Sequence, residues 1–183
     1  RTLTHLGLLN GGAGASASPL SATALGRAVA RIPTEVRLAR ALLIARGIMG
    51  AKRAAEATAL LSTGLRPPGG DLTALARSVR DGGTHTGMWR AEARRLERAA
   101  ERLGARDASL DAATATPPPL AEAVALVSAL ARPEWIAHRR GPRPAAGSQA
   151  SYASVGGAGL RTARASVLGS SPWLAVADVD AAL

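Results

Sequence analysis

The chain has no cysteine, no phenylalanine and few other aromatic residues, with three Trp and one Tyr among 183 residues. Without thiols it cannot form disulfides, thiolate metal sites or cysteine nucleophiles, which fits a reducing compartment. It also lacks an apolar run near the roughly 20 residues of a membrane span, and its N-terminus shows no signal-peptide pattern. We therefore expect a cytoplasmic protein.

Large apolar side chains are scarce as well. Alanine supplies 43 of the hydrophobic residues, and leucine, with 24, supplies most of the rest. Because an alanine side chain buries little apolar area, we expect a thin core built on leucine.

Basic residues outnumber acidic ones by 23 to 13, and all of them except Lys52 are arginine. A net charge of +10 favours binding to polyanions such as nucleic acid. A composition rich in arginine and alanine is also typical of a GC-rich genome, so composition alone leaves both explanations open.

Helical periodicity and turn residues predict a mainly α chain with strands near its C-terminal end. A first helix runs to about Leu9 and precedes a Gly/Ala/Ser-rich loop at 10–19. Thr23 can cap the next helix, which Pro33 stops after Arg31. Further helices are expected at 35–47, 51–62, 72–79, 88–103 and 120–130, and strands at 135–138, 152–155 and 173–179. The Pro-rich joint at 114–119 is the best candidate domain boundary.

The helix expected at 88–103 has two regular faces. Its apolar face carries Trp89, Ala93, Leu96, Ala100 and Leu103. A neighbouring face carries an arginine every four residues: Arg90, Arg94, Arg98 and Arg102. These arginines form either a solvated face, paired with Glu92, Glu97 and Glu101, or a surface that contacts a phosphate backbone.

A second basic segment, residues 132–164, carries six arginines against Glu134 alone. Basic β surfaces bind single-stranded nucleic acid when arginine contacts phosphate and aromatic rings stack on bases. Trp135 and Tyr152 are the nearby aromatic residues, and each could stack on a base or belong to the core.

No motif for catalysis or metal binding is present in the sequence. Residues 47–53 resemble a phosphate loop but lack its Gly-Lys-Ser/Thr ending. None of the three histidines, His5, His85 and His138, has a second ligand three or four residues later in the chain. Asp178 and Asp180 could act as paired carboxylates, although such residues more often face solvent at the end of a strand. We therefore expect no catalytic residue, metal or cofactor in this chain.

Several segments resemble the helicase-associated region of DEAH-type ATP-dependent helicases, in particular the bacterial HrpB branch. The resemblance begins with TALGR at 23–27, ARIP at 30–33 and RLARALL at 37–43. It continues with AAE at 54–56, ALLS at 59–62, GGDL at 69–72, WRAEARRL at 89–96, PEWIAHRR at 133–140 and WLAVAD at 173–178. Two residues depart from the family pattern: Val36 stands at a usual Pro, and Trp135 at a usual Arg.

The resemblance implies three parts. Residues 1–31 would end a winged-helix module, 32–115 would form a helical ratchet bundle, and 116–183 would begin the C-terminal region with a partial OB-like β element. The motor, two RecA-like domains that bind ATP and Mg, would lie upstream in a longer parent protein. The chain would then guide a single strand, RNA rather than DNA, through these predicted contacts: Arg90, Arg94, Arg98, Arg102, Arg139, Arg140, Arg143 and Arg161.

A different class of function remains open at this point. A helical adaptor that binds protein partners would have the same helices, and its arginine content would only reflect genome composition. The adaptor has no need of the arginine row at 90–102 or of the surplus charge at 132–164, so these two features separate the alternatives.

Overall fold

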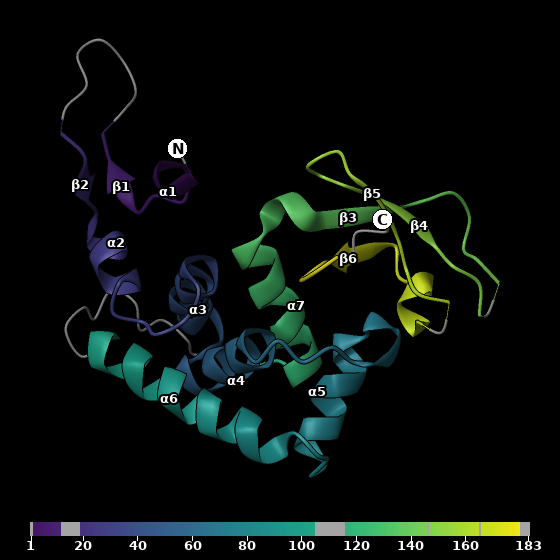
Figure 1. Ribbon diagram of the computed structural model, residues 1–183, viewed down its shortest axis with the longest axis horizontal. Coiled ribbons are helices and arrows are strands. Elements are labelled where there is room, and N and C mark those ends of the chain that lie inside the picture. Colours follow the sequence, from purple (N-terminus) through teal and green to yellow (C-terminus); the bar gives the residue numbers. More distant parts are fainter. Residues whose placement is uncertain (1, 12–18, 105–115, 146, 165, 180–183) are drawn as a thin grey trace.

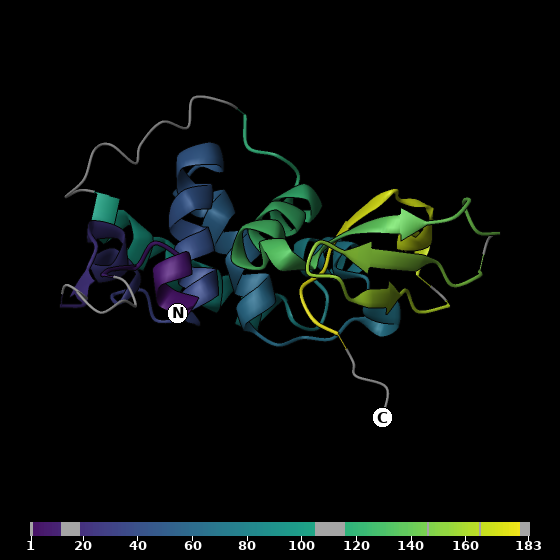
Figure 2. The ribbon, with the colours of Figure 1, turned by 90° about the horizontal axis from the view of Figure 1, so that it is seen from above.

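The computed structural model describes residues 2–11, 19–104, 116–145, 147–164 and 166–179. Most of the predicted 10–19 loop, the start of the Pro-rich joint and Asp180 lie outside these ranges. The described chain is mainly helical with a small antiparallel sheet near its C-terminal end (Figure 1), which confirms the mainly α fold class. A short N-terminal hairpin, the helices and the sheet follow one another along the molecule (Figure 2).

The long helices agree closely with the sequence prediction. They are α3 (Val36–Met49), α4 (Ala51–Ser62), α5 (Leu72–Arg80), α6 (Thr86–Gly104) and α7 (Leu120–Ala131). Helix α3 continues past Gly47, its predicted end, because the change of direction falls at Gly50. The φ of Gly50 is +82°, a conformation that glycine adopts without steric cost.

The N-terminal segment differs from the prediction. Helix α1 (Thr2–His5) ends before Gly7, and Leu9 lies in β1 (Leu9–Asn10), which pairs antiparallel with β2 (Ser21–Ala22). Gly7 has a φ of +71°, so the helix cannot continue to Leu9 as predicted. Helix α2 (Ala24–Val29) starts as expected, since the Thr23 hydroxyl accepts a hydrogen bond of 2.9 Å from the Gly26 amide.

Helices α3 to α7 share one apolar core, and α4 packs against α3, α6 and α7. Many of its buried residues are alanines, which let the helix backbones approach closely. The largest fully buried side chains include Leu42, Leu43, Met49, Leu60, Leu96 and Leu120. The core is therefore the leucine-based core that the composition predicts.

Helix α7 crosses the predicted domain division at 115/116. The sequence prediction includes it in the C-terminal part. In the structure it packs on α3, α4 and α5, and its buried residues Leu120, Val124 and Val127 join their core. A Pro-rich connection thus leads from one helix of the bundle to another, and the main packing unit extends to residue 131.

The sheet contains four antiparallel strands in the order β5-β4-β3-β6. They are β3 (Ile136–Arg140), β4 (Ser151–Ser154), β5 (Gly159–Arg161) and β6 (Trp173–Ala175). Strand β5 was not predicted, because its three residues are too short for a visible alternation. The sheet has its own small core of Ala137, Ala150 and Tyr152, separate from that of the helices.

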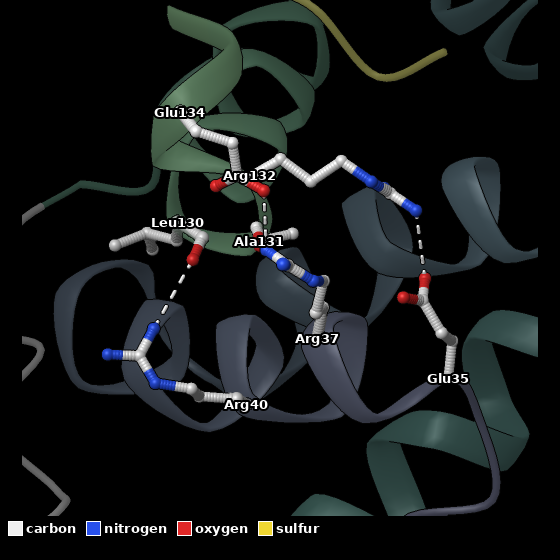
Figure 3. Close-up of polar contacts among 7 residues, drawn as sticks. All are labelled: Glu35, Arg37, Arg40, Leu130, Ala131, Arg132 and Glu134. Carbon is white, nitrogen blue, oxygen red and sulfur yellow. Dashed lines mark hydrogen bonds and ion pairs between the residues drawn. The ribbon is translucent and has the colours of Figure 1, made fainter. Parts of the chain in front are cut away.

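Polar contacts join α3 to the end of α7 and to the 3-10 helix Pro133–Trp135, which leads into β3 (Figure 3). Arg37 Nη1 donates to the Ala131 carbonyl at 3.2 Å and lies 2.8 Å from Glu134 Oε1, just before β3. Arg40 Nη1 donates to the Leu130 carbonyl at 3.3 Å. Because unpaired carbonyls at a helix C-terminus carry partial negative charge, two guanidinium groups from α3 are well placed to satisfy the end of α7.

Candidate nucleic-acid interface

Helix α6 places its four predicted arginines on the face that points away from the core. Trp89, Leu96 and Ala100 are buried, and α6 packs along α4 through them. All four arginines of the row, Arg90, Arg94, Arg98 and Arg102, are exposed. With a rise of about 1.5 Å per residue, successive members are about 6 Å apart along the helix axis, and the row is about 18 Å long.

The glutamates of α6 do not pair with this arginine row. Glu92 instead binds Arg95 at 2.7 Å and accepts a hydrogen bond from Ser62 at 3.2 Å, and these contacts lower the pKa of its carboxyl group. Within the described part of the chain, no ion pair or hydrogen bond engages Arg90, Arg94, Arg98 or Arg102. The sequence also allowed a solvated face in which Glu92, Glu97 and Glu101 pair with these arginines. The described structure does not contain those ion pairs.

Glu97 occupies the edge between α6 and α4. Burial raises the pKa of its carboxyl group, and the neighbouring Glu101 and Glu56 raise it further, while Lys52 and Arg98 act in the opposite direction. Burial and the two neighbouring acids thus outweigh Lys52 and Arg98, and Glu97 forms no ion pair with the arginine row within the described residues.

The four predicted arginines of the C-terminal part have two different environments. Arg139 is half-buried and donates to the carbonyls of Ser170 at 2.9 Å and Gly169 at 3.4 Å, so it fastens the 3-10 helix Val167–Ser170 against the sheet. The other three, Arg140, Arg143 and Arg161, are exposed and have no hydrogen bond or ion pair within the described residues.

Strand register explains this difference. Successive residues of a strand point to opposite faces, so Arg139 and Arg140 lie on opposite sides of the sheet. Arg139 pairs with Tyr152 on the inner face, whereas Arg140 pairs with Ser151, which in turn pairs with Arg161. Arg140 and Arg161 therefore lie in one row on the outer face, and Arg139 does not belong to it.

The two basic surfaces lie on different parts of the molecule. Helix α6 runs along one side of the bundle, and the sheet lies beyond α7 on the other (Figure 1). The structure therefore places the arginine row of α6 and the outer row of the sheet on separate surfaces, each of which must be considered on its own.

The exposed aromatic residue is not one of those that the sequence indicated. Tyr152 is buried, and its hydroxyl donates to the Ser171 carbonyl at 2.7 Å; burial raises the pKa of this hydroxyl. Trp135 is half-buried, with the Arg132 guanidinium 5.4 Å from its ring centroid. Trp173 is 58% exposed, and its ring centroid lies 4.5 Å from that of His138. Trp173 belongs to an apolar segment, so the sequence did not indicate that its side chain is exposed. Its exposure depends on strand register.

The described residues offer little for metal or acid–base chemistry. No three His, Asp or Glu side chains gather closely enough in them to hold a metal ion. Asp178 forms an exposed ion pair with Arg66 at 2.8 Å, and its predicted partner Asp180 lies outside the described ranges. None of the helices in those ranges combines the length and apolarity needed to cross a membrane.

No protein-family model, curated protein or solved structure matches this chain. The family resemblance noted in the sequence therefore stays a prediction, and the chain is assigned only as a mainly helical protein with a small antiparallel sheet.

Proposed function

We propose that this chain is the accessory nucleic-acid-binding segment of an ATP-dependent RNA helicase of the HrpB type. In this proposal it guides a single strand for a RecA-type motor in another part of the parent protein. The observation that carries the proposal is the row Arg90, Arg94, Arg98 and Arg102, four exposed side chains without an acidic partner in the described chain.

A row of this kind suits a phosphate backbone. A strand that binds there releases condensed counterions for each phosphate that an arginine neutralises, and this supplies affinity without reading sequence. The guanidinium group also donates two parallel hydrogen bonds to phosphate oxygens. A helicase segment that advances along any strand needs this kind of contact.

The parts of the proposal divide the described chain as follows. The β1–β2 hairpin with α1 and α2 is the end of a winged-helix module, the helices from α3 onward form the ratchet bundle, and the sheet is the partial OB-like element. ATP and Mg bind to the RecA-like domains of the parent protein. We expect no ATP hydrolysis by this chain, whose sequence has no Gly-Lys-Ser/Thr phosphate loop.

Binding of a labelled poly-uridine strand over a series of salt concentrations tests this proposal. We expect a steep loss of affinity with salt for the native chain. Changing Arg90, Arg94, Arg98 and Arg102 together to Gln should make the slope of log affinity against log salt shallower by about 2 to 3, since each phosphate contact on a single strand contributes about 0.7. An unchanged slope and affinity would remove α6 from the interface.

A pair of double variants controls for net charge. R94Q/R98Q and R77Q/R80Q remove the same charge, and Arg77 and Arg80 are exposed on α5. We expect the α6 pair to lower the slope by about 1.4 and the α5 pair to leave it nearly unchanged. Equal effects would mean that the strand responds only to net charge, as expected for the adaptor alternative.

A further inference from the structure

The outer face of the sheet combines an exposed aromatic residue with unpaired arginines. Trp173, His138, Ala153 and Gly159 are joined by strand pairing into one row across β6, β3, β4 and β5. Arg140, Ser151 and Arg161 form the next row on the same face. The two rows are about 7 Å apart, because residues two apart in a strand share a face at about 3.4 Å per residue.

We propose that this face is a binding site for unpaired bases of a single-stranded nucleic acid. A base stacks on the ring of Trp173 beside His138, and the phosphates of the strand bind to Arg140 and Arg161. The site extends the proposed function, on which it rests for its ligand class, but it uses none of the residues of α6.

The aromatic end of the face is held in place by its neighbours. The Trp173 and His138 rings are in contact, tilted by 58° at a centroid distance of 4.5 Å, within the range of aromatic pairs. His138 thus supports one side of the indole, and 58% of Trp173 stays exposed for a ligand. Ala153 has only a methyl group and Gly159 has no side chain, so a planar base can lie flat over this part of the row.

The charge of this face selects an anionic ligand. Residues 135–177 contain five arginines and no acidic residue. Arg140 and Arg161 have no partner within the described residues, whereas Arg139 is used on the inner face. A positive surface next to an exposed ring fits phosphate and base together, and stacking on the ring requires a base that is not already paired in a duplex.

The test compares two single strands of equal length, poly-uridine and an abasic sugar-phosphate strand, in binding to the full chain. Stacking is worth about 1 to 3 kcal/mol per base, so Trp173→Leu should weaken binding of poly-uridine by about 5- to 150-fold and leave the abasic strand unaffected. Trp173→Phe, which keeps a ring, should retain most of the affinity. Val167→Ala removes an exposed apolar side chain from the 3-10 helix behind the sheet and should change neither.

The arginines are tested by salt dependence. R140Q/R161Q should lower the salt slope by about 1.4, while R77Q/R80Q should not. Equal binding of poly-uridine by the native chain and by Trp173→Leu, with circular dichroism showing both folded, would overturn the site.

If only the α6 variants weaken binding, the sheet site is wrong and the proposed function stands. If only the sheet variants do, the α6 interface is wrong. If the native chain binds neither strand at low salt, both are overturned.

Discussion

Arginine side chains of equal charge end in very different environments in this chain. Arg37 and Arg40 satisfy carbonyls at the end of α7 (Figure 3), and Arg46 is buried and donates to the Ala100 carbonyl at 2.8 Å. Arg95 pairs with Glu92 and also donates to the Pro33 carbonyl. A count of positive charges therefore overestimates the surface available to a polyanion, and only contacts distinguish structural from free guanidinium groups.

Two glutamates of α6 should affect stability in opposite directions. Arg95 and Ser62 lower the pKa of Glu92, so its charged form stabilises the fold above the ordinary glutamate pKa, and this contribution is lost as the pH falls through the lowered value. Burial and Glu101 raise the pKa of Glu97, so its charged form costs stability at neutral pH, and this cost disappears as the pH falls through the raised value.

At about pH 7 we expect Glu92→Gln to lower the melting temperature and Glu97→Gln to raise it, each by about 1–3 °C, since partly exposed charges contribute at most about 1 kcal/mol. At about pH 3.5 the difference for Glu97 should be largely lost, because its raised pKa lies above this pH, whereas the difference for Glu92 should be smaller than at pH 7 and disappear only below its lowered pKa. Thermal denaturation at the two pH values measures this. A shift of equal sign in the two variants at pH 7 would contradict the assignment.

At the scale of elements, α2 depends on a close approach to β1. A Cβ atom at Gly26 would collide with the carbonyl oxygen of Leu8, which accepts a hydrogen bond of 3.0 Å from the Thr23 amide. Thr23 and Gly26 belong to one sequence motif but have different structural roles. Thr23 caps the helix, and Gly26 lets it lie against the chain that leads into the hairpin.

The substitution Gly26→Ala should therefore destabilise the chain by about 1 to 3 kcal/mol, a loss of roughly 3–10 °C in melting temperature. Gly87→Ala is the matched control, because Gly87 also lies in a helix but its Cβ would meet nothing within 4 Å. Alanine should leave that helix unchanged or slightly more stable. Thermal melts of the two variants provide the measurement, and similar melting temperatures would contradict the close approach.

The whole molecule is divided by packing at a different place from the Pro-rich joint. Helix α7 buries Leu120, Val124 and Val127 among the earlier helices, whereas the apolar core of the sheet consists of Ala137, Ala150 and Tyr152 within the described residues. A separate 116–183 fragment would expose the apolar face of α7 and keep a core too small for an independent fold.

We therefore expect residues 116–183 alone to be poorly folded, although α7 is packed among the other helices in the complete chain. Amide NMR spectra of the fragment should show little dispersion, and the complete chain is the control. Sharp, dispersed signals from the fragment would contradict the packing argument and would support a domain boundary at the joint.

Local sequence was sufficient for those parts of the fold that depend on neighbouring residues. The Thr23 cap, the bounds of α4, the apolar face of α6 and the exposure of its arginine row follow from capping groups and a period of 3.6 residues. Each is a property of residues at most a few turns apart, which is why a single sequence predicts them.

Tertiary structure decided everything that depends on distant partners. Arg37 and Arg139 bind carbonyls about 30 to 100 positions away in the chain. The inward direction of Arg139 and the exposure of Trp173 also depend on strand register. A shift of register by one residue moves every side chain to the other face of a sheet, and no local pattern encodes that choice in strands of three to five residues. The amount of positive charge was thus evident from the sequence, while its distribution into two outer surfaces was set by packing.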